Sequence, residues 1–245
     1  MHKINLFLRS SLFFGCMSLS TIPFSILVIL CWPLSQPVRY KVASGWAILN
    51  IWLLKQICGL SHQIEGLENI KEGENGIILC KHQSAWETLA LQTIFPNQAW
   101  VLKRELFKIP IYGWALAATD PIAINRQNKR AALKAIIQQG IKKLKQGRWI
   151  VIFPEGTRMA PGERGNYGGS GGLLAHKSGY AITPIAHNAG EFWRRRGFIK
   201  QPGVIQVRIG PAIRLEEGRK ASELNKLAEE WIESNMAEIN DQKAN

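Results

Sequence analysis

Apolar residues dominate the first 60 positions of the chain. No acidic or basic side chain lies between Arg9 and Arg39, and the run from Leu12 to Leu34 is predominantly apolar. Because a helix needs about 20 apolar residues to cross the hydrocarbon core of a bilayer, this run predicts a membrane-associated helix. Pro23 lies near its middle. Since proline kinks helices, one kinked span and a re-entrant bend both remain open.

A second apolar stretch covers residues 42–60 and contains Trp46 and Trp52, a residue type that favours the membrane interface. Two adjacent helices in one leaflet, or a hairpin, would bury both stretches together. A cleaved secretory signal is disfavoured, because the first run exceeds the roughly 7–15 residues of such signals and no small-x-small cleavage pattern follows it. We therefore expect residues 1–60 to form N-terminal membrane-anchoring helices.

From about Ile64 onward, short apolar runs separated by glycine and proline alternate with longer helical stretches, a pattern typical of an α/β domain. The predicted strands are residues 76–80, 99–103, 121–125, 148–154, 181–186 and 204–210. The predicted helices are residues 85–94, 129–146 and 222–238, the last with alternating charges typical of a solvated cover. The glycine-rich segment 162–172 is expected to be a loop. Residues 61–245 would then form one domain.

The net charge of the chain limits the classes of binding partner. The net charge is +13, of which residues 1–60 supply +5 because they hold five basic side chains and no acidic one. This balance favours an anionic partner: nucleic acid, an anionic membrane surface or a phosphorylated small molecule. The basic run 194–196 lies near a long apolar anchor, where it fits anionic headgroups better than nucleic acid. The four cysteines form no CxxC pair, so neither a disulfide framework nor a metal site is expected.

The segment KHQSAWETLA carries a candidate catalytic pair. His82 directly follows a predicted buried strand, and Glu87 comes five positions later. On one continuous helix the two side chains would diverge by about 140°, so they can meet only if His82 lies on the turn before the helix. There the carboxylate could hold one imidazole nitrogen while the other accepts a proton. Ser84 and Glu87 also fit a capping box, and these residues support the two interpretations equally.

A second candidate site is FPEGTR, residues 153–158, where a predicted strand ends at proline. Gly156 permits close backbone approach, and Arg158 offers a planar fork suited to phosphate. Each residue singly also fits a plain turn with a solvated arginine. The six together are harder to explain in this way.

These segments occur with others in a recognisable order. KHQSAWE, the run 103–114, Arg126 in AINR, FPEGTR, and TPIA at 183–186 resemble the ordered sequence blocks of the glycerolipid acyltransferase family, and most closely its bacterial 1-acyl-glycerol-3-phosphate acyltransferases. The resemblance implies a mixed sheet flanked by helices. It also implies acyl transfer from acyl-CoA or acyl carrier protein to the sn-2 hydroxyl of 1-acyl-glycerol-3-phosphate (lysophosphatidic acid), giving phosphatidic acid.

The resemblance implies a role for each matching residue. His82 would be the general base oriented by Glu87, and Lys103 would stabilise the oxyanion. The acceptor phosphate and glycerol would be bound by Arg126, Glu155, Gly156, Thr157 and Arg158. Pro184 and its neighbours would lie on the acyl-chain or donor side. The resemblance implies no cofactor beyond the thioester co-substrate and no acyl-enzyme, in agreement with a sequence that has no GxSxG elbow.

Three positions depart from the commonest family pattern. Glu87 stands where aspartate is commoner, which retains the carboxylate but changes its reach. Met159 stands where serine is usual, and the loop 167–175 has glycine and serine where lysine or arginine is frequent. We therefore assign no phosphate contact to that loop.

Two other functions are compatible with the same sequence. One is an acyltransferase for a different lysophospholipid or an amine-bearing lipid, and the other is a non-enzymatic basic membrane-binding protein. For the enzyme, the expected partners are a phospholipid membrane, lysophosphatidic acid and the acyl donor. The catalytic domain is expected on the cytoplasmic face of the inner membrane, because the donors are found there and Arg39 and Lys41 flank the apolar run.

Overall fold

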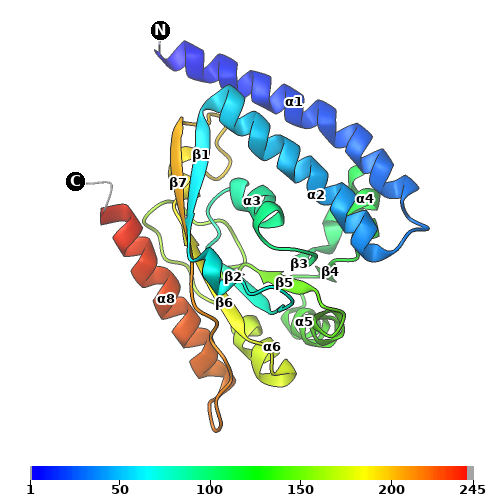
Figure 1. Ribbon diagram of the computed structural model, residues 1–245, viewed down its shortest axis with the longest axis vertical. Helices are drawn as coiled ribbons and strands as arrows, with labels where there is room; N and C mark the ends of the chain where they lie inside the picture. The colour runs from blue at the N-terminus through cyan, green and yellow to red at the C-terminus, as the bar shows by residue number, and fades with distance from the viewer. Residues whose placement is uncertain (1, 242–245) are drawn as a thin grey trace.

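The computed structural model describes residues 2–241, and in this part of the chain one seven-stranded sheet has helices on both faces (Figure 1). The strands are β1 (Leu60–Glu65), β2 (Ile77–Cys80), β3 (Gln98–Lys103), β4 (Ile122–Ile124), β5 (Trp149–Ile152), β6 (Ile182–His187) and β7 (Gly203–Ile209). Their order across the sheet is β1-β7-β6-β2-β5-β3-β4, and every pair is parallel except β6 with β7. The predicted mixed α/β sheet is confirmed.

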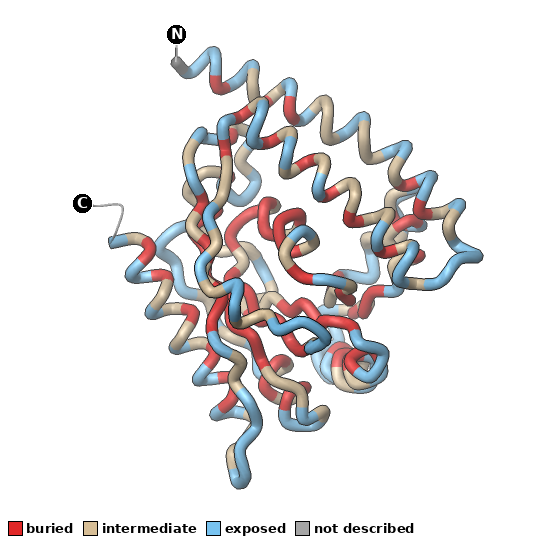
Figure 2. The backbone as a smooth tube through the Cα atoms, viewed as in Figure 1, coloured by how far each residue is buried: buried red, intermediate tan, exposed pale blue. Residues whose placement is uncertain are grey.

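The central strands β2 and β5 are buried at every residue and rich in isoleucine and valine, as expected for parallel strands covered on both faces (Figure 2). Along β2, Ile78 and Cys80 pack into one apolar cluster while Ile77 and Leu79 pack into the other. Because β2 and β5 are parallel neighbours, their carboxyl ends lie at the same edge of the sheet. The segments that follow them, with His82 and FPEGTR, are thereby brought together.

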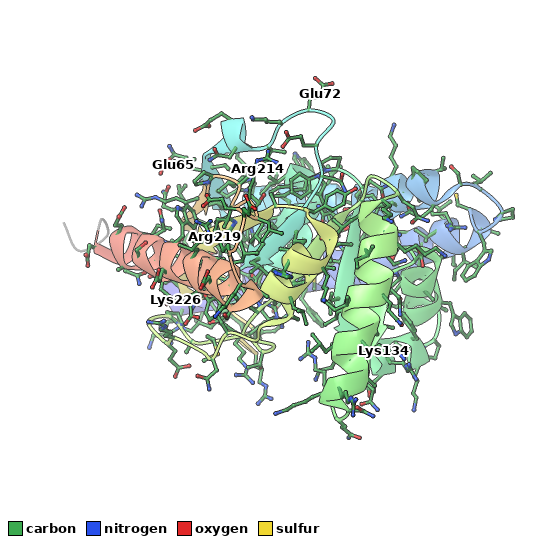
Figure 3. The ribbon with its side chains drawn as sticks, turned by 90° about the horizontal axis from the view of Figure 1, so that it is seen from below. Glu65, Glu72, Lys134, Arg214, Arg219 and Lys226 are labelled. Carbon is green, nitrogen blue, oxygen red and sulfur yellow. The ribbon has the colours of Figure 1, made fainter. Side chains whose placement is uncertain are left out.

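Two layers of helices cover the sheet. One contains α1 (His2–Leu30), α2 (Gln36–Leu53) and α3 (Trp86–Ile94), with α4 (Tyr112–Ala118) against α1. The other contains α5 (Lys129–Leu144), α6 (Ser170–Ser178) and α8 (Ala221–Asp241), and Figure 3 looks onto this layer. Short connections form α7 (Ala189–Phe192), a π-helical turn (Leu54–Cys58) and 3-10 turns (Leu67–Asn69, Arg104–Lys108). Helices α1 and α8 therefore lie on opposite sides of the molecule (Figure 1).

Helices α1 and α2 lie side by side as a hairpin (Figure 1). Helix α1 continues through Pro23, so the re-entrant bend is not formed. At the interface, Ser20 Oγ accepts hydrogen bonds from Trp46 Nε1 at 3.2 Å and Asn50 Nδ2 at 3.4 Å. Large apolar side chains elsewhere on α1 are exposed, including Leu19 and Leu30, and the helix is long and apolar enough to cross a membrane. This exposed apolar surface suggests membrane association.

Some elements differ from the sequence prediction. Helix α6 begins at Ser170, inside the segment expected to be a loop, and β1, α4 and α7 were not predicted. A Cβ on Gly171 would meet the Leu79 side chain at 2.5 Å, and one on Gly172 would meet the Ala221 carbonyl oxygen at 2.2 Å. These glycines let α6 pack closely against β2 and the start of α8. Packing of this kind offsets the low helix propensity of glycine.

The last predicted helix is confirmed as α8. Its inner face is less solvated than the alternating charges suggested, because apolar side chains one helical turn apart are buried against the sheet. These are Leu224, Ala228, Ile232, Met236 and Ile239.

Candidate active site

His82 lies on the turn between β2 and α3, as the sequence required. Its Nδ1 is 2.8 Å from Glu87 Oε1. The imidazole is 12% exposed, whereas the Glu87 side chain is fully buried. The expected contact between the two side chains is present, with the histidine on the accessible side.

Glu87 also caps the start of α3. Its Oε1 accepts hydrogen bonds from the backbone N–H groups of Gln83 at 3.0 Å and Ser84 at 2.8 Å. Ser84 Oγ in turn accepts from the Trp86 N–H at 3.1 Å. One carboxylate therefore makes both sets of contacts that the sequence left open, to the imidazole and to the backbone.

The hydrogen bonds to Glu87 also fix its charge. Burial alone would raise the pKa of this carboxyl group, but the hydrogen bonds from His82 and from the Ser84 backbone outweigh it, and the pKa of Glu87 is lowered. Glu87 is thus an ionised acceptor at neutral pH, so His82 Nδ1 carries the proton that is donated to it. The opposite ring nitrogen, Nε2, is then the one that can accept a proton.

The FPEGTR segment holds His82 from the other side. The His82 ring stacks on Phe153, with ring centroids 3.9 Å apart and planes 12° from parallel. The backbone N–H of His82 donates to Glu155 Oε2 at 3.0 Å, and its carbonyl oxygen accepts from the Met159 N–H at 2.7 Å. The two sequence segments therefore form one unit around the imidazole.

A cavity of about 420 Å³ lies beside this unit, between α1, α2, α3, α4 and β3. Its walls are largely apolar and aromatic, and include Phe24, Val28, Leu89, Trp100 and Leu116. Phe153, the stacking partner of His82, also lines it, whereas His82 is not among the described residues at its wall. Three basic side chains contribute to the lining: Lys103, Arg126 and Arg158. The cavity combines an apolar interior with cations next to the imidazole.

The basic residues reach the cavity from three different segments. Lys103 is exposed at the carboxyl end of β3, and Arg126 follows β4 and donates from Nη1 to the carbonyl oxygen of Gly156. Burial lowers the pKa of Arg126, and the charge of Glu105 opposes this shift. Arg158 has a buried Nε for which residues 2–241 supply no hydrogen-bond partner. Arg158 also lines the cavity, and a guanidinium there is suited to an anionic ligand.

The turn between these arginines has the conformation that the sequence suggested. Gly156 has φ of +67°, in the left-handed region that favours glycine. Thr157, which follows it, is exposed. The structure thus brings together His82, Glu87, Lys103, Arg126, Gly156, Thr157 and Arg158 at one edge of the sheet.

Two residues lie elsewhere. The Glu155 side chain is fully buried, and its Oε1 pairs with Lys81 Nζ at 2.7 Å while its Oε2 binds the His82 N–H. Its carboxylate is engaged inside the protein and does not face the acceptor side of the site. Pro184 is buried in β6, beside Gly210 and under Trp231 of α8. It lies on the sheet face covered by α8 and does not line the cavity.

Three residues that hold the site had no role assigned to them from the sequence. Phe153, which the sequence placed within FPEGTR, stacks on His82, and His187 Nε2 donates to the Lys81 carbonyl oxygen at 2.9 Å. The third is Lys81, which directly precedes His82. Burial lowers the pKa of His187, so it is a neutral donor here. The position of Lys81, directly before His82 at the end of a buried strand, could have indicated its role. The sequence around His187, far along the chain, contains no such indication.

The described residues 2–241 contain no group of three or more histidine, cysteine, aspartate or glutamate side chains placed to hold a metal ion. The four cysteines are unpaired.

Comparison with known proteins places this geometry in a family. Residues 61–188 match the family model described as Acyltransferase. The chain belongs to the acyltransferase family. Within that family, a Pseudomonas aeruginosa protein named 1-acyl-sn-glycerol-3-phosphate acyltransferase is 44% identical over 236 residues, covering 95% of this chain and 91% of that protein. A Helicobacter pylori protein of the same name is 36% identical over 115 residues, covering 45% of this chain and 48% of that protein.

A solved structure shows the same fold. The crystal structure of the 1-acyl-sn-glycerophosphate (LPA) acyltransferase PlsC from Thermotoga maritima matches with a TM-score of 0.79 at 22% identity, covering 98% of both chains. This acyltransferase-family chain therefore shares the arrangement of that structure over almost its full length, including α1 and α2.

Proposed function

We propose that the chain transfers a fatty acyl group from a thioester donor, acyl-CoA or acyl carrier protein, to the sn-2 hydroxyl of lysophosphatidic acid, giving phosphatidic acid. One observation carries the proposal: a carboxylate-held imidazole lies next to a largely apolar cavity that is also lined by two arginines and a lysine. The name of the Pseudomonas aeruginosa relative describes the same activity for that protein.

In this mechanism His82 Nε2 removes the proton of the acceptor hydroxyl as its oxygen attacks the thioester carbonyl. Glu87 balances the charge of the imidazolium that forms, and Lys103 stabilises the oxyanion of the tetrahedral intermediate. The intermediate collapses by breaking the carbon–sulfur bond, and the imidazolium returns its proton to the leaving thiolate. The products are the ester and the free thiol, and no acyl-enzyme is formed.

The cations and the apolar walls of the cavity would bind different parts of the substrates. Arg158 and Arg126 would bind the acceptor phosphate by charge-assisted hydrogen bonds. The apolar walls would accept a fatty acyl chain, since a volume of about 420 Å³ lies within the usual range for small-molecule sites. A bound acyl chain filling this apolar space would also keep water from hydrolysing the thioester.

The exposed apolar surface of α1 would hold the enzyme at the bilayer that contains its acceptor and its product. We place the catalytic domain on the cytoplasmic face of the inner membrane, where the donors are found, with Arg39 and Lys41 on that side. Protease added to the cytoplasmic face of sealed, oriented vesicles should digest residues 61–245. Survival of this domain would contradict the orientation.

The activity is tested with the purified full chain, lysophosphatidic acid and acyl-CoA or acyl carrier protein. Phosphatidic acid and free thiol should appear in equal amounts. A panel of other lysophospholipids and amine-bearing lipids tests the acceptor. Acyl transfer to one of these lipids and not to lysophosphatidic acid would show that the proposed acceptor is wrong. No acyl transfer to any acceptor would favour a membrane-binding protein without catalysis.

A further inference from the structure

Lys81 is a buried charge that the proposed mechanism does not use. It directly precedes His82, and its side chain is only 1% exposed. The ammonium pairs with Glu155 Oε1 at 2.7 Å and with Glu233 Oε1 at 2.8 Å, and it donates to the Glu163 carbonyl oxygen at 3.1 Å. Glu233 belongs to α8, on the side of the sheet opposite the cavity.

Glu233 has a second partner that fixes its orientation. The Tyr167 hydroxyl donates to the same Oε1 at 2.7 Å, and burial together with this hydrogen bond raises the pKa of Tyr167. Glu233 is 19% exposed, whereas Glu155 is fully buried. Burying an ion pair costs several kcal/mol per ion in desolvation, so stability alone is a weak explanation for this cluster.

The cluster leads directly to the catalytic histidine. Successive side chains of an extended chain point to opposite faces, so Lys81 faces α8 while His82 faces α3. Glu155 links the two, because Oε1 binds the Lys81 ammonium and Oε2 accepts the His82 N–H at 3.0 Å. His187 binds the Lys81 carbonyl oxygen at 2.9 Å. Both polar ends of the peptide bond between Lys81 and His82 are therefore fixed.

We propose that Glu233 is a positioning residue for acyl transfer, acting through Lys81 and Glu155 on the peptide bond that carries His82. The inference rests on the proposed function of His82 as the base. Without the Glu233 carboxylate, Lys81 keeps a single carboxylate partner, Glu155, and the ammonium and Glu155 can shift together. Glu155 Oε2 then no longer holds the His82 N–H in one place. A displacement of the base by about 1 Å can cost roughly 100-fold in rate.

The expected signature is a change in kcat without a change in KM. Glu233→Ala should lower kcat by roughly 10- to 100-fold, by the same displacement argument. The KM for lysophosphatidic acid should stay within about twofold, because α8 does not line the cavity within the described residues. Glu233→Gln keeps an oxygen acceptor for Lys81 and Tyr167, so it should fall between Glu233→Ala and wild type.

Glu230→Ala is the matched control. Glu230 is on the same helix but is 56% exposed, and it pairs only loosely, at 3.5 Å, with Lys226, which Figure 3 labels on α8. This variant should have wild-type kcat and KM. Assays on all variants are run at least 15 °C below the melting temperature measured for each, so that loss of folded protein does not contribute.

A second measurement does not depend on acyl transfer. The NMR signal of the His82 imidazole, assigned by its absence in His82→Ala, should move in Glu233→Ala and stay in place in Glu230→Ala. If wild type makes no phosphatidic acid but the signal moves, the proposed function fails and the structural link stands. A folded Glu233→Ala with wild-type kcat overturns the inference. If Glu233→Ala does not fold, wild-type kcat in Glu233→Gln overturns it.

Discussion

His82→Ala is expected to lower kcat for acyl transfer by roughly 10²- to 10⁴-fold, the range that a positioned general base contributes. The variant loses the only group in the described site that is both held by an ionised carboxylate and able to accept the hydroxyl proton. Lysophosphatidic acid should still bind, because Arg126 and Arg158 are unchanged. The measurement is the initial rate of phosphatidic acid and thiol release at saturating donor, with KM determined for the acceptor.

His176→Ala is the control for this variant, because His176 is exposed on α6 and is not among the residues that line the cavity. Its kcat should equal that of wild type. The melting temperature of His82→Ala should fall, because the buried Glu87 carboxylate loses the hydrogen bond from His82 and keeps only those from the backbone before α3. A folded His82→Ala protein with an undiminished rate would remove the base from the mechanism.

The sequence was sufficient to predict the helices and strands that have a local hydrophobic pattern. Buried strands such as IILC and WIVI, and the periodic helix 129–146, were found because burial on both faces or on one helical face leaves a pattern in a short window. The same holds for the turn carrying His82, where the spacing to Glu87 allowed only one arrangement that joins them. Local patterns therefore predicted six of the seven strands and the one position from which His82 could contact Glu87, whereas β1 was missed.

Helix α6 could not be found in this way. Its segment contains Gly171 and Gly172, which locally favour a loop. Glycine is required at these positions because β2 and the start of α8 pack closely against α6. These contacts join segments that are distant in the sequence, so a short sequence window does not reveal them.

The placement of Glu155 was missed for a related reason. The FPEGTR pattern indicated a strand-ending turn with an arginine suited to phosphate, but not which side chains would face inward. The inward direction of Glu155 is set by Lys81 and, through it, by Glu233, which lies 78 positions further along the chain than Glu155. A buried ion pair between distant segments has no signature in a single sequence. The same applies to Pro184, whose burial under Trp231 depends on where α8 packs.

Arg158→Ala is expected to raise the KM for lysophosphatidic acid by roughly 10- to 100-fold. A hydrogen bond to a charged group contributes about 1.5–3 kcal/mol, and 1.4 kcal/mol corresponds to a factor of about ten in affinity. The buried Nε of Arg158, without a partner among residues 2–241, is the donor that a phosphate would satisfy. Arg158→Lys should recover only part of the loss, because an ammonium keeps the charge but not the fork. Arg214→Ala, which removes an exposed partner of Glu74, should have no effect.

An acceptor without a phosphate separates this role from general damage to the site. With a monoacylglycerol as acceptor, wild type and Arg158→Ala should have similar kcat/KM, because neither enzyme can gain the phosphate contact. The full effect should therefore appear with lysophosphatidic acid and disappear with the uncharged lipid. An equal loss with both acceptors would show that Arg158 supports the fold of the turn, where Met159 binds the His82 carbonyl oxygen, and does not bind the phosphate.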